Sequence, residues 1–198
     1  MRVIGVDGGA KGAFAVYDAG SKRIQEIHDM PVFHMEINGK KRVRIDAVGV
    51  YELLSYQQMV GCQLVMIEAV GGRPAQSASA AFVFGYGIGM VYMACIALKL
   101  PIETVPARTW KGIMRMPGKK DTQGKKSTEK DGMIISRADE LMPDARDMWR
   151  KPRGGFMVDR AEAACIAKYA GDHALRLDAR PPLAVETLLA YQNADTGA

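Results

Sequence analysis

Four carboxylates stand at the ends of otherwise apolar segments of the sequence. Asp7 ends the first β-branched run, and Glu68 follows the most hydrophobic run of the chain. Asp159 and Glu162 are three residues apart at the start of a segment with a helical pattern, so both should project from one helix face. A charge at the edge of an apolar run is costly unless something compensates it.

Four carboxylates that converge on one point repel one another unless a cation neutralises them. Oxygen ligands without His or Cys suit the hard cation Mg²⁺, with Mn²⁺ as an alternative. Two such ions can activate a water and stabilise the leaving oxygen when a phosphodiester is hydrolysed. Each acid alone has a structural explanation, such as Asp159 capping its helix, so the metal hypothesis rests on all four together. The histidines His28, His34 and His173 lie far apart, which makes chemistry based on a His cluster improbable.

The elements that must position these acids alternate between strands and helices. The predicted strands are Arg2–Asp7, Ala13–Tyr17, Arg23–Met30, Gln63–Ile67 and Pro101–Val105. The first three predict an antiparallel meander, and the near-continuous apolar run Gln63–Ile67 suits a central strand. The expected fold class is therefore α/β, with a mixed five-stranded sheet (three antiparallel strands, then parallel strands) flanked by helices. If the first and fourth strands are neighbours, Asp7 and Glu68 lie side by side at an edge where sites collect.

Five helices are expected between and after these strands. The predicted ranges are 46–60, 78–98, 106–114, 128–141 and 158–170. Asp46 is the expected N-cap of the first helix. Thr128 and Asp131 resemble a capping box for the fourth, with Asp in place of the usual Glu.

The connecting segments predict one domain with a tail. Pro31–Ile45 is polar and basic and is expected to form a loop or an added hairpin around Asn38 and Gly39. Met116–Ser127 is expected to be mobile, and Pro143–Gly155 to be a loop. We assign residues 1–171 to the domain and 172–198 to a C-terminal tail.

The segment 78–98 is apolar on all sides, and no charged residue occurs from Pro74 to Leu98. It is long enough to cross a bilayer. It also follows a predicted buried strand and contains three glycines, at positions 85, 87 and 89. We therefore predict a buried helix and no membrane span. The glycines would allow another backbone to approach closely, within the domain or across a dimer interface.

The composition is that of an ordinary globular protein. Of the 198 residues, 48% are apolar and 25% are charged, which excludes disordered and fibrous classes. The three cysteines (Cys62, Cys95 and Cys165) are odd in number and form no Cys-x-x-Cys pair, so neither a disulfide framework nor a structural zinc site is expected. An acid at position 7 comes too early for a signal peptide. A reducing cytoplasm is the expected location.

The positive charge is concentrated in one segment. Between Arg108 and Lys130 there are eight bases and only two acids, Asp121 and Glu129, which leaves +6 against +5 for the whole chain. Such a run can follow phosphates, although a solvated loop has the same composition. Together with Arg73, the expected DNA-binding residues are Arg108, Lys111, Arg115, Lys119, Lys120, Lys125, Lys126 and Lys130.

Three motifs in order resemble the RuvC-type Holliday-junction resolvases of the RNase H-like superfamily, and most closely their phage-borne branch. The motifs are I-G-V-D-G-G-A-K-G-A-F-A-V, V-M-I-E-A-V and D-R-A-E-A-A-C-I-A, and the resemblance runs from residue 1 to about 171. It implies an RNase H-like fold, two Mg²⁺ ions held by Asp7, Glu68, Asp159 and Glu162, and a homodimer in a bacterial or phage-infected host cytoplasm. It also implies that Lys111, in P-A-R-T-W-K, lies close to the scissile phosphate.

The chain departs from the family pattern at two places. Glu162 stands where the family often has Asp. In bacterial members, the acid at the end of this strand is followed within a few residues by an aromatic side chain that enters the junction as a wedge. In this chain no aromatic residue stands there, because Glu68 is followed by Ala69, Val70, Gly71, Gly72 and Arg73. The stretch R-P-A-Q-S-A-S-A-A-F-V-F-G instead resembles the phage branch, whose members look like broader nucleases of branched DNA.

The expected function is a Mg²⁺-dependent endodeoxyribonuclease that cleaves Holliday junctions and other branched DNA in recombination and repair. Three alternatives stay open. The D-G-G-A-K-G opening also resembles the phosphate loop of actin-like kinases and ATPases, although those enzymes need two such domains. A non-catalytic, resolvase-like DNA-binding module is the second alternative. The third is the RuvX-type group, whose chains are shorter and do not suit the long basic segment.

Overall fold

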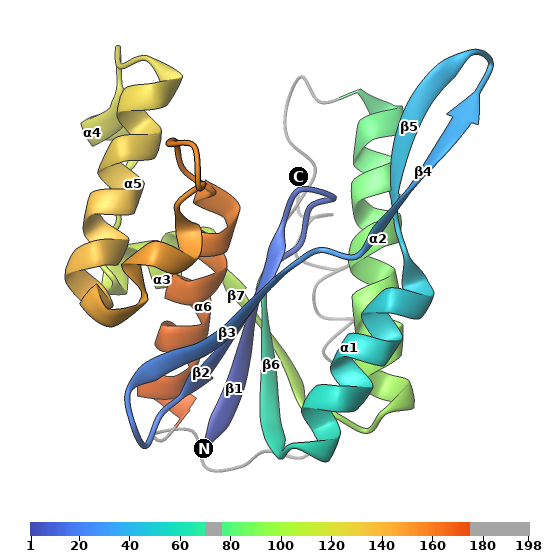
Figure 1. The fold of residues 1–198 in the computed structure, drawn as a ribbon, viewed down its shortest axis with the longest axis horizontal. Helices are drawn as coiled ribbons and strands as arrows, with labels where there is room; N and C mark the ends of the chain where they lie inside the picture. Colours follow the sequence, from blue (N-terminus) through green and yellow to red (C-terminus); the bar gives the residue numbers. More distant parts are fainter. Residues whose placement is uncertain (70–76, 175–198) are drawn as a thin grey trace, which may run out of the picture.

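Five strands form one mixed sheet in the order β3-β2-β1-β6-β7 in the computed structural model, which describes residues 1–69 and 77–174 (Figure 1). The strands are β1 (Arg2–Asp7), β2 (Ala13–Asp18), β3 (Arg23–Asp29), β6 (Cys62–Ala69) and β7 (Ile102–Pro106). The first three pair antiparallel, and β6 and β7 run parallel to β1. The predicted fold class is confirmed.

Helices cover both faces of the sheet (Figure 1). The helices α1 (Ala47–Met59) and α2 (Ala78–Ala97) lie on one face. On the other face, α6 (Val158–Ala174) packs against β1 and β2, and α5 (Ser127–Leu141) packs on α6. Each sheet face therefore has its own apolar core. The α6 side contains the two tryptophans, Trp110 and Trp149, both fully buried.

The contact between α6 and β1 depends on Gly5. A Cβ atom at Gly5 would lie 2.2 Å from the backbone nitrogen of Ala167 and 2.4 Å from the carbonyl oxygen of Ala163. Only glycine allows the helix backbone to approach the strand this closely. The alanines on the facing side of α6 bring the whole helix, including its first turn, onto the end of β1.

The first helix begins as predicted, but the fourth begins differently. Asp46 caps α1 by accepting a hydrogen bond from the backbone N–H of Val48 at 3.0 Å. The predicted capping box of Thr128 and Asp131 is wrong, because α5 already starts at Ser127. The Glu129 carboxylate instead accepts from the backbone N–H of Lys126 at 2.8 Å, three residues before it.

Two connecting segments contain short helices. The predicted loop 143–155 is wrong in its first half, where Pro143–Trp149 forms the 3₁₀ helix η1. Proline favours the first helical position, and Trp149 fixes the other end by donating from its Nε1 to Asp139 Oδ1 at 2.9 Å. The basic segment contains α3 (Ala107–Ile113) and α4 (Lys119–Thr122).

The segment 31–45 forms the hairpin rather than the loop. Its strands β4 (Val32–Ile37) and β5 (Lys40–Ile45) make a separate two-stranded sheet. The turn residues Asn38 and Gly39 have φ values of 53° and 72°, in the left-handed region that a two-residue hairpin turn requires.

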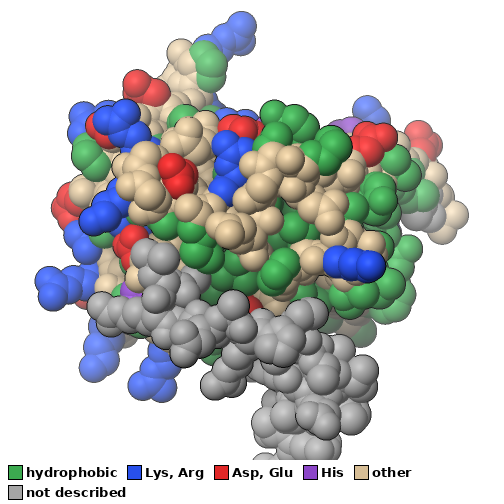
Figure 2. Space-filling view, turned by 90° about the horizontal axis from the view of Figure 1, so that it is seen from below, with side chains coloured by type: hydrophobic (Ala, Val, Ile, Leu, Met, Phe, Trp, Pro, Cys, Tyr) green, Lys and Arg blue, Asp and Glu red, His purple; other side chains and the backbone are tan. Residues whose placement is uncertain are grey.

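The prediction that α2 is fully buried is wrong. One side packs on the sheet, but Phe82, Tyr86 and Met93 are 73%, 57% and 61% exposed. Figure 2 looks from the end where β1 begins and shows hydrophobic side chains over the half with α1 and α2, and most Lys and Arg side chains over the opposite half. Within residues 1–69 and 77–174, no helix combines the length and apolarity needed to cross a membrane.

The described part of the last helix passes the expected domain end. α6 runs through residue 171 to Ala174. Residues 175–198, most of the predicted tail, lie outside the described residues, so the boundary at 171 stays a prediction.

Candidate active site

The register of the sheet places Asp7 beside Glu68. β1 and β6 are parallel, and Val6 lies opposite Ile67, so the next residues of both strands are neighbours. Side chains alternate along a strand. Val6 and Ile67 face the α1 and α2 side, so Asp7 and Glu68 face α6.

The first turns of α6 supply the other two acids. Asp159 lies in the first turn of the helix, and Glu162 lies one turn further on the same face. Asp7 and Asp159 lie close enough for each carboxyl group to affect the pKa of the other. The structure thus brings together the four acids predicted from the sequence.

The pKa values of the acids reflect this crowding. Burial, followed by the charges of Glu162, Asp159 and Glu68, raises the pKa of Asp7 from 3.8 to about 8. Burial also raises the pKa of Asp159, and the charge of Glu162 adds to this effect. Without a metal ion, Asp7 therefore retains its proton at neutral pH.

The helix α3 brings one cation and one donor to these acids. Lys111 Nζ lies 2.7 Å from Glu162 Oε1 and 5.0 Å from the centre of the Trp110 ring. Burial alone would lower the pKa of Lys111, but the charges of Glu162, Glu68 and Asp7 and the hydrogen bond to Glu162 raise it. Lys111 is thus a charged partner of the four acids.

Trp110 has a role that the sequence did not reveal. Its indole Nε1 donates a hydrogen bond to Glu68 Oε2 at 2.8 Å, while the ring is fully buried. The sequence allowed a packing or a DNA-stacking role for this tryptophan. A second residue that we did not predict is Lys11, in the turn between β1 and β2, whose charge lowers the pKa of Asp159. The motif D-G-G-A-K-G was its only sequence signal.

The four acids match a hard divalent cation in chemistry, although no such site is preformed. Within the described ranges, no three acidic, His or Cys side chains are arranged to hold a metal ion. Two of the four are engaged elsewhere, Glu68 with Trp110 and Glu162 with Lys111. The donor set nevertheless consists only of carboxylate oxygens, and the raised pKa of Asp7 shows that negative charge at this point lacks compensation.

The fold is shared with solved resolvase structures. A structure of Thermus thermophilus RuvC is 16% identical, with a TM-score of 0.50, and the match covers 91% of this chain and 99% of that chain. T. thermophilus RuvC in complex with a Holliday junction substrate is 12% identical, with a TM-score of 0.54 over 92% and 100% of the two chains. The yeast mitochondrial Holliday junction resolvase Ydc2 is 16% identical, with a TM-score of 0.50 over 89% and 80%.

This chain has the fold of the RuvC-type resolvases. The resemblance inferred from the sequence is confirmed at the level of the fold. No protein-family model and no curated protein sequence matches the chain. Its place in the phage-borne branch stays a prediction.

Most of the predicted DNA-binding residues that the structure describes lie on the surface of the molecule. Among those whose side chains the structure describes, only Lys111 forms an ion pair with one of the four acids, Glu162. Arg108, Arg115, Lys120, Lys125 and Lys126 are exposed, and Lys130 is half-buried. Figure 1 shows α4 and the start of α5 at the same end of the molecule as the carboxyl ends of β1 and β6. Lys119 belongs to α4, and Arg73, together with the segment that would hold a wedge, lies outside the described residues.

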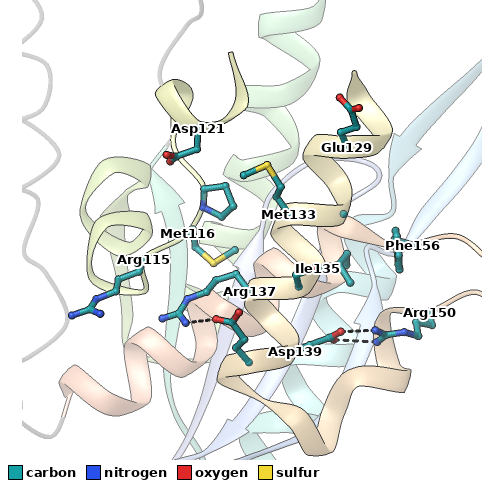
Figure 3. A pocket seen from close by; sticks show the side chains of 14 residues that line it. Arg115, Met116, Asp121, Glu129, Met133, Ile135, Arg137, Asp139, Arg150 and Phe156 are labelled. Carbon is teal, nitrogen blue, oxygen red and sulfur yellow. Dashed lines mark hydrogen bonds and ion pairs between the residues drawn. The ribbon is translucent and has the colours of Figure 1, made fainter. Parts of the chain in front are cut away.

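A hollow on the α5 side of the molecule does not contain the acids. It has a volume of about 800 Å³ and lies between α5 and the segment that follows α3 (Figure 3). Charged side chains in its walls pair with one another, Arg150 with Asp139 and Arg137 with Glu140. None of the four acids lines it, so we place the chemistry at the strand ends and not in this hollow.

Proposed function

We propose that this protein is a Mg²⁺-dependent, structure-selective endodeoxyribonuclease that cleaves Holliday junctions and other branched DNA. The observation that carries the proposal is the convergence of Asp7, Glu68, Asp159 and Glu162, from two strands and one helix, with the pKa of Asp7 raised to about 8. The RuvC-type fold supports the same conclusion. Half-buried acids gathered in this way destabilise a protein unless they hold a cation.

The side chains of this chain would divide the work as follows. The four acids would hold two Mg²⁺ ions, or Mn²⁺ in their place, with Asp7 as the shared ligand. When bound, the metal would supply water activation and charge neutralisation at the phosphodiester. Lys111 would move its ammonium group from Glu162 to a phosphate oxygen and stabilise the charge that develops there. Trp110 would keep Glu68 oriented toward the site.

The proposed partners are branched DNA and a second copy of the chain. The exposed cations of α3, α4 and the start of α5 would neutralise DNA phosphates. An apolar groove of about 510 Å³ between α1 and α2, with Tyr51, Tyr86 and Met93 in its lining, is the candidate dimer face. Two symmetric sites could then cut two strands of one junction. The three buried, unpaired cysteines support the proposed cytoplasmic location.

The test is a cleavage assay on four-way junctions, flaps, forks and linear duplex of matched sequence. We expect cleavage of branched substrates with Mg²⁺ or Mn²⁺, none in EDTA, and 5′-phosphate and 3′-hydroxyl ends. Asp7→Asn should abolish cutting while junction binding stays equal or becomes tighter, because the substitution removes repulsion toward phosphate. Cutting by Asp7→Asn would refute the site assignment.

The alternatives predict other outcomes in the same assay. A non-catalytic module would bind junctions but cut none of the substrates with any divalent ion. An actin-like phosphate binder would turn over ATP with Mg²⁺ and show no nuclease activity. The four gathered acids argue against a pure binder, because they repel DNA phosphates without a compensating benefit.

A further inference from the structure

The β4–β5 hairpin lies outside the site described above and is strongly basic. It carries Lys40, Lys41, Arg42 and Arg44 against the single acid Glu36. Within the part of the chain that the structure describes, none of these four cations forms an ion pair. Arg44 only donates to the backbone oxygen of Val43. The proposed catalytic mechanism uses none of them.

The register of the hairpin sorts its side chains onto two faces. Residues directly opposite each other in a strand pair lie on the same face. Arg44 pairs with Phe33, and Arg42 pairs with Met35, so these four share one face with Lys40. The only acid, Glu36, pairs with Lys41 on the other face. We call the first set, Phe33, Met35, Lys40, Arg42 and Arg44, the outward face.

The root pair of the opposite face anchors the hairpin to the body of the protein. Its root pair, Val32 and Ile45, packs with the core of the α1 and α2 side. A Cβ atom at Gly87 of α2 would lie 2.3 Å from Ile45 Cδ1, so this contact is tight. At the root, the outward face therefore points away from α2. Phe33 and Met35 on it are 45% and 37% exposed.

The hairpin extends toward the end of the molecule that carries the site. Strands of six residues reach about 20 Å from their root. Figure 1 shows the tip rising at the same end as the carboxyl ends of β1 and β6. In this view α4 and the start of α5 rise on the other side of the site. Two basic projections thus stand on opposite sides of the acids.

We propose that the outward face is a second DNA-binding surface, which holds a duplex arm of the branched substrate. This inference rests on the proposed function. The major groove of DNA, about 12 Å wide, admits a two-stranded β-ribbon. Lys40, Arg42 and Arg44 alternate along β5 at intervals of about 7 Å, a spacing that lets each neutralise a different phosphate. A symmetric contact between two copies through this face would oppose cations with no carboxylate to neutralise them.

Binding of four-way junctions in EDTA, over a range of salt concentrations, tests the surface. The double variant Lys40→Gln/Arg42→Gln should bind about tenfold more weakly, and its salt slope should fall by about 2. The control Lys22→Gln/Lys99→Gln removes the same charge from exposed residues near the start of β1 and β7, at the opposite end of the sheet, and should match the wild type. If the hairpin variant also matches the wild type, the hairpin does not bind DNA.

A crosslinking experiment locates the contact directly. The native cysteines are all buried, so a photoreactive group can be attached selectively to Met35→Cys on the outward face. We expect light to link this position to a duplex arm of the junction, and a group on Lys22→Cys to give no such product. Links between two protein chains without links to DNA would overturn the proposal.

The two proposals fail in different ways. If the wild type cuts branched DNA and the hairpin variants behave like it, only the second surface is refuted. If the wild type neither binds nor cuts any branched substrate, the proposed function falls, and the hairpin proposal falls with it.

Discussion

Of the four acids, Asp7 is the one whose negative charge destabilises the folded state most. The structure raises its pKa to about 8 through burial and three neighbouring acids. Between about pH 4 and pH 8 the unfolded chain therefore releases a proton that the folded chain keeps. Because the unfolded state binds fewer protons in this window, the free energy of unfolding decreases as the pH rises.

Asp7→Asn should remove this decrease. In EDTA at pH 8 we expect the variant to be more stable than the wild type by about 5 kcal/mol, since the pKa of Asp7 is raised from 3.8 to about 8 and each pKa unit corresponds to about 1.4 kcal/mol. Urea unfolding from pH 4 to pH 8 measures the effect. Asp18→Asn is the control, and it should lower the free energy of unfolding rather than raise it. Hydrogen bonds from Ser21 and Gly20 lower the pKa of Asp18 to about 2, so its charged form stabilises the folded state. Parallel pH profiles for Asp7→Asn and the wild type would contradict this account.

Trp110 should orient Glu68 rather than contact DNA. We expect Trp110→Phe to raise the Mg²⁺ concentration needed for half-maximal cleavage about tenfold, and to weaken the stabilisation by Mg²⁺ measured in urea unfolding. Trp149→Phe is the matched control. This tryptophan is equally buried, and its Nε1 binds Asp139 away from the four acids.

Both substitutions should lower the free energy of unfolding by about 1 to 3 kcal/mol, because both shrink a buried side chain and remove a hydrogen bond. Only Trp110→Phe should change the Mg²⁺ requirement. Equal Mg²⁺ requirements in the two variants would make Trp110 a packing residue only.

The sequence predicted the four acids because each stands where an apolar element begins or ends. It did not predict the hydrogen bond from Trp110 to Glu68. These residues are 42 positions apart, and their contact depends on how α3 turns after β7. Local patterns show which residues can do chemistry, whereas orienting contacts of this kind come from tertiary packing.

Among the elements, α6 positions two of the four acids, Asp159 and Glu162. Its close contact with β1 at Gly5 holds them near Asp7. Gly5→Ala should lower the free energy of unfolding by about 3 kcal/mol, because the added methyl group would overlap the backbone of α6. Gly85→Ala on α2 is the control. There the methyl group meets open space, and the helix should gain about 0.5 to 1 kcal/mol.

Urea unfolding of the two glycine variants measures both effects. Gly5→Ala should also lower cleavage more than its loss of stability explains, since Asp159 and Glu162 would move away from Asp7. A wild-type unfolding midpoint for Gly5→Ala would refute the close approach of α6 and β1.

The elements also differed in how well the sequence predicted them. The five strands and their mixed antiparallel and parallel pairing followed from their apolar runs and turns, whereas the order of the strands in the sheet did not. The helix η1 was missed, because its burial depends on Trp149 and on the partner Asp139 in α5. The exposed side of α2 was missed because apolar residues surround that helix, so the pattern does not indicate which side faces the sheet.

At the scale of the whole molecule, the apolar groove between α1 and α2 predicts self-association. Tyr86→Glu/Met93→Glu should shift a dimer to a monomer, because it places charges in the exposed lining of the groove. Sedimentation velocity measures the change. Met59→Glu, on an exposed side chain outside that lining, should leave the dimer intact.

The Tyr86→Glu/Met93→Glu variant also tests how the two sites of the proposed dimer cooperate on a junction. A monomer should nick one strand and release the DNA, whereas a dimer should cut two strands in one encounter. Paired cuts by a monomeric variant would separate self-association from resolution.

The closure of the hairpin root has a consequence for substrate choice. The N–H of Asp46 donates to the carbonyl oxygen of Pro31 at 2.9 Å, so the chain leaves and re-enters the body at one point. Residue pairs can therefore be removed from or added to the tip while Val32 and Ile45 still fill the core. The length of the hairpin can therefore change without a change in the fold or in the position of the four acids. If the hairpin holds a duplex arm as proposed, a change in its length alone would alter which branched substrates fit.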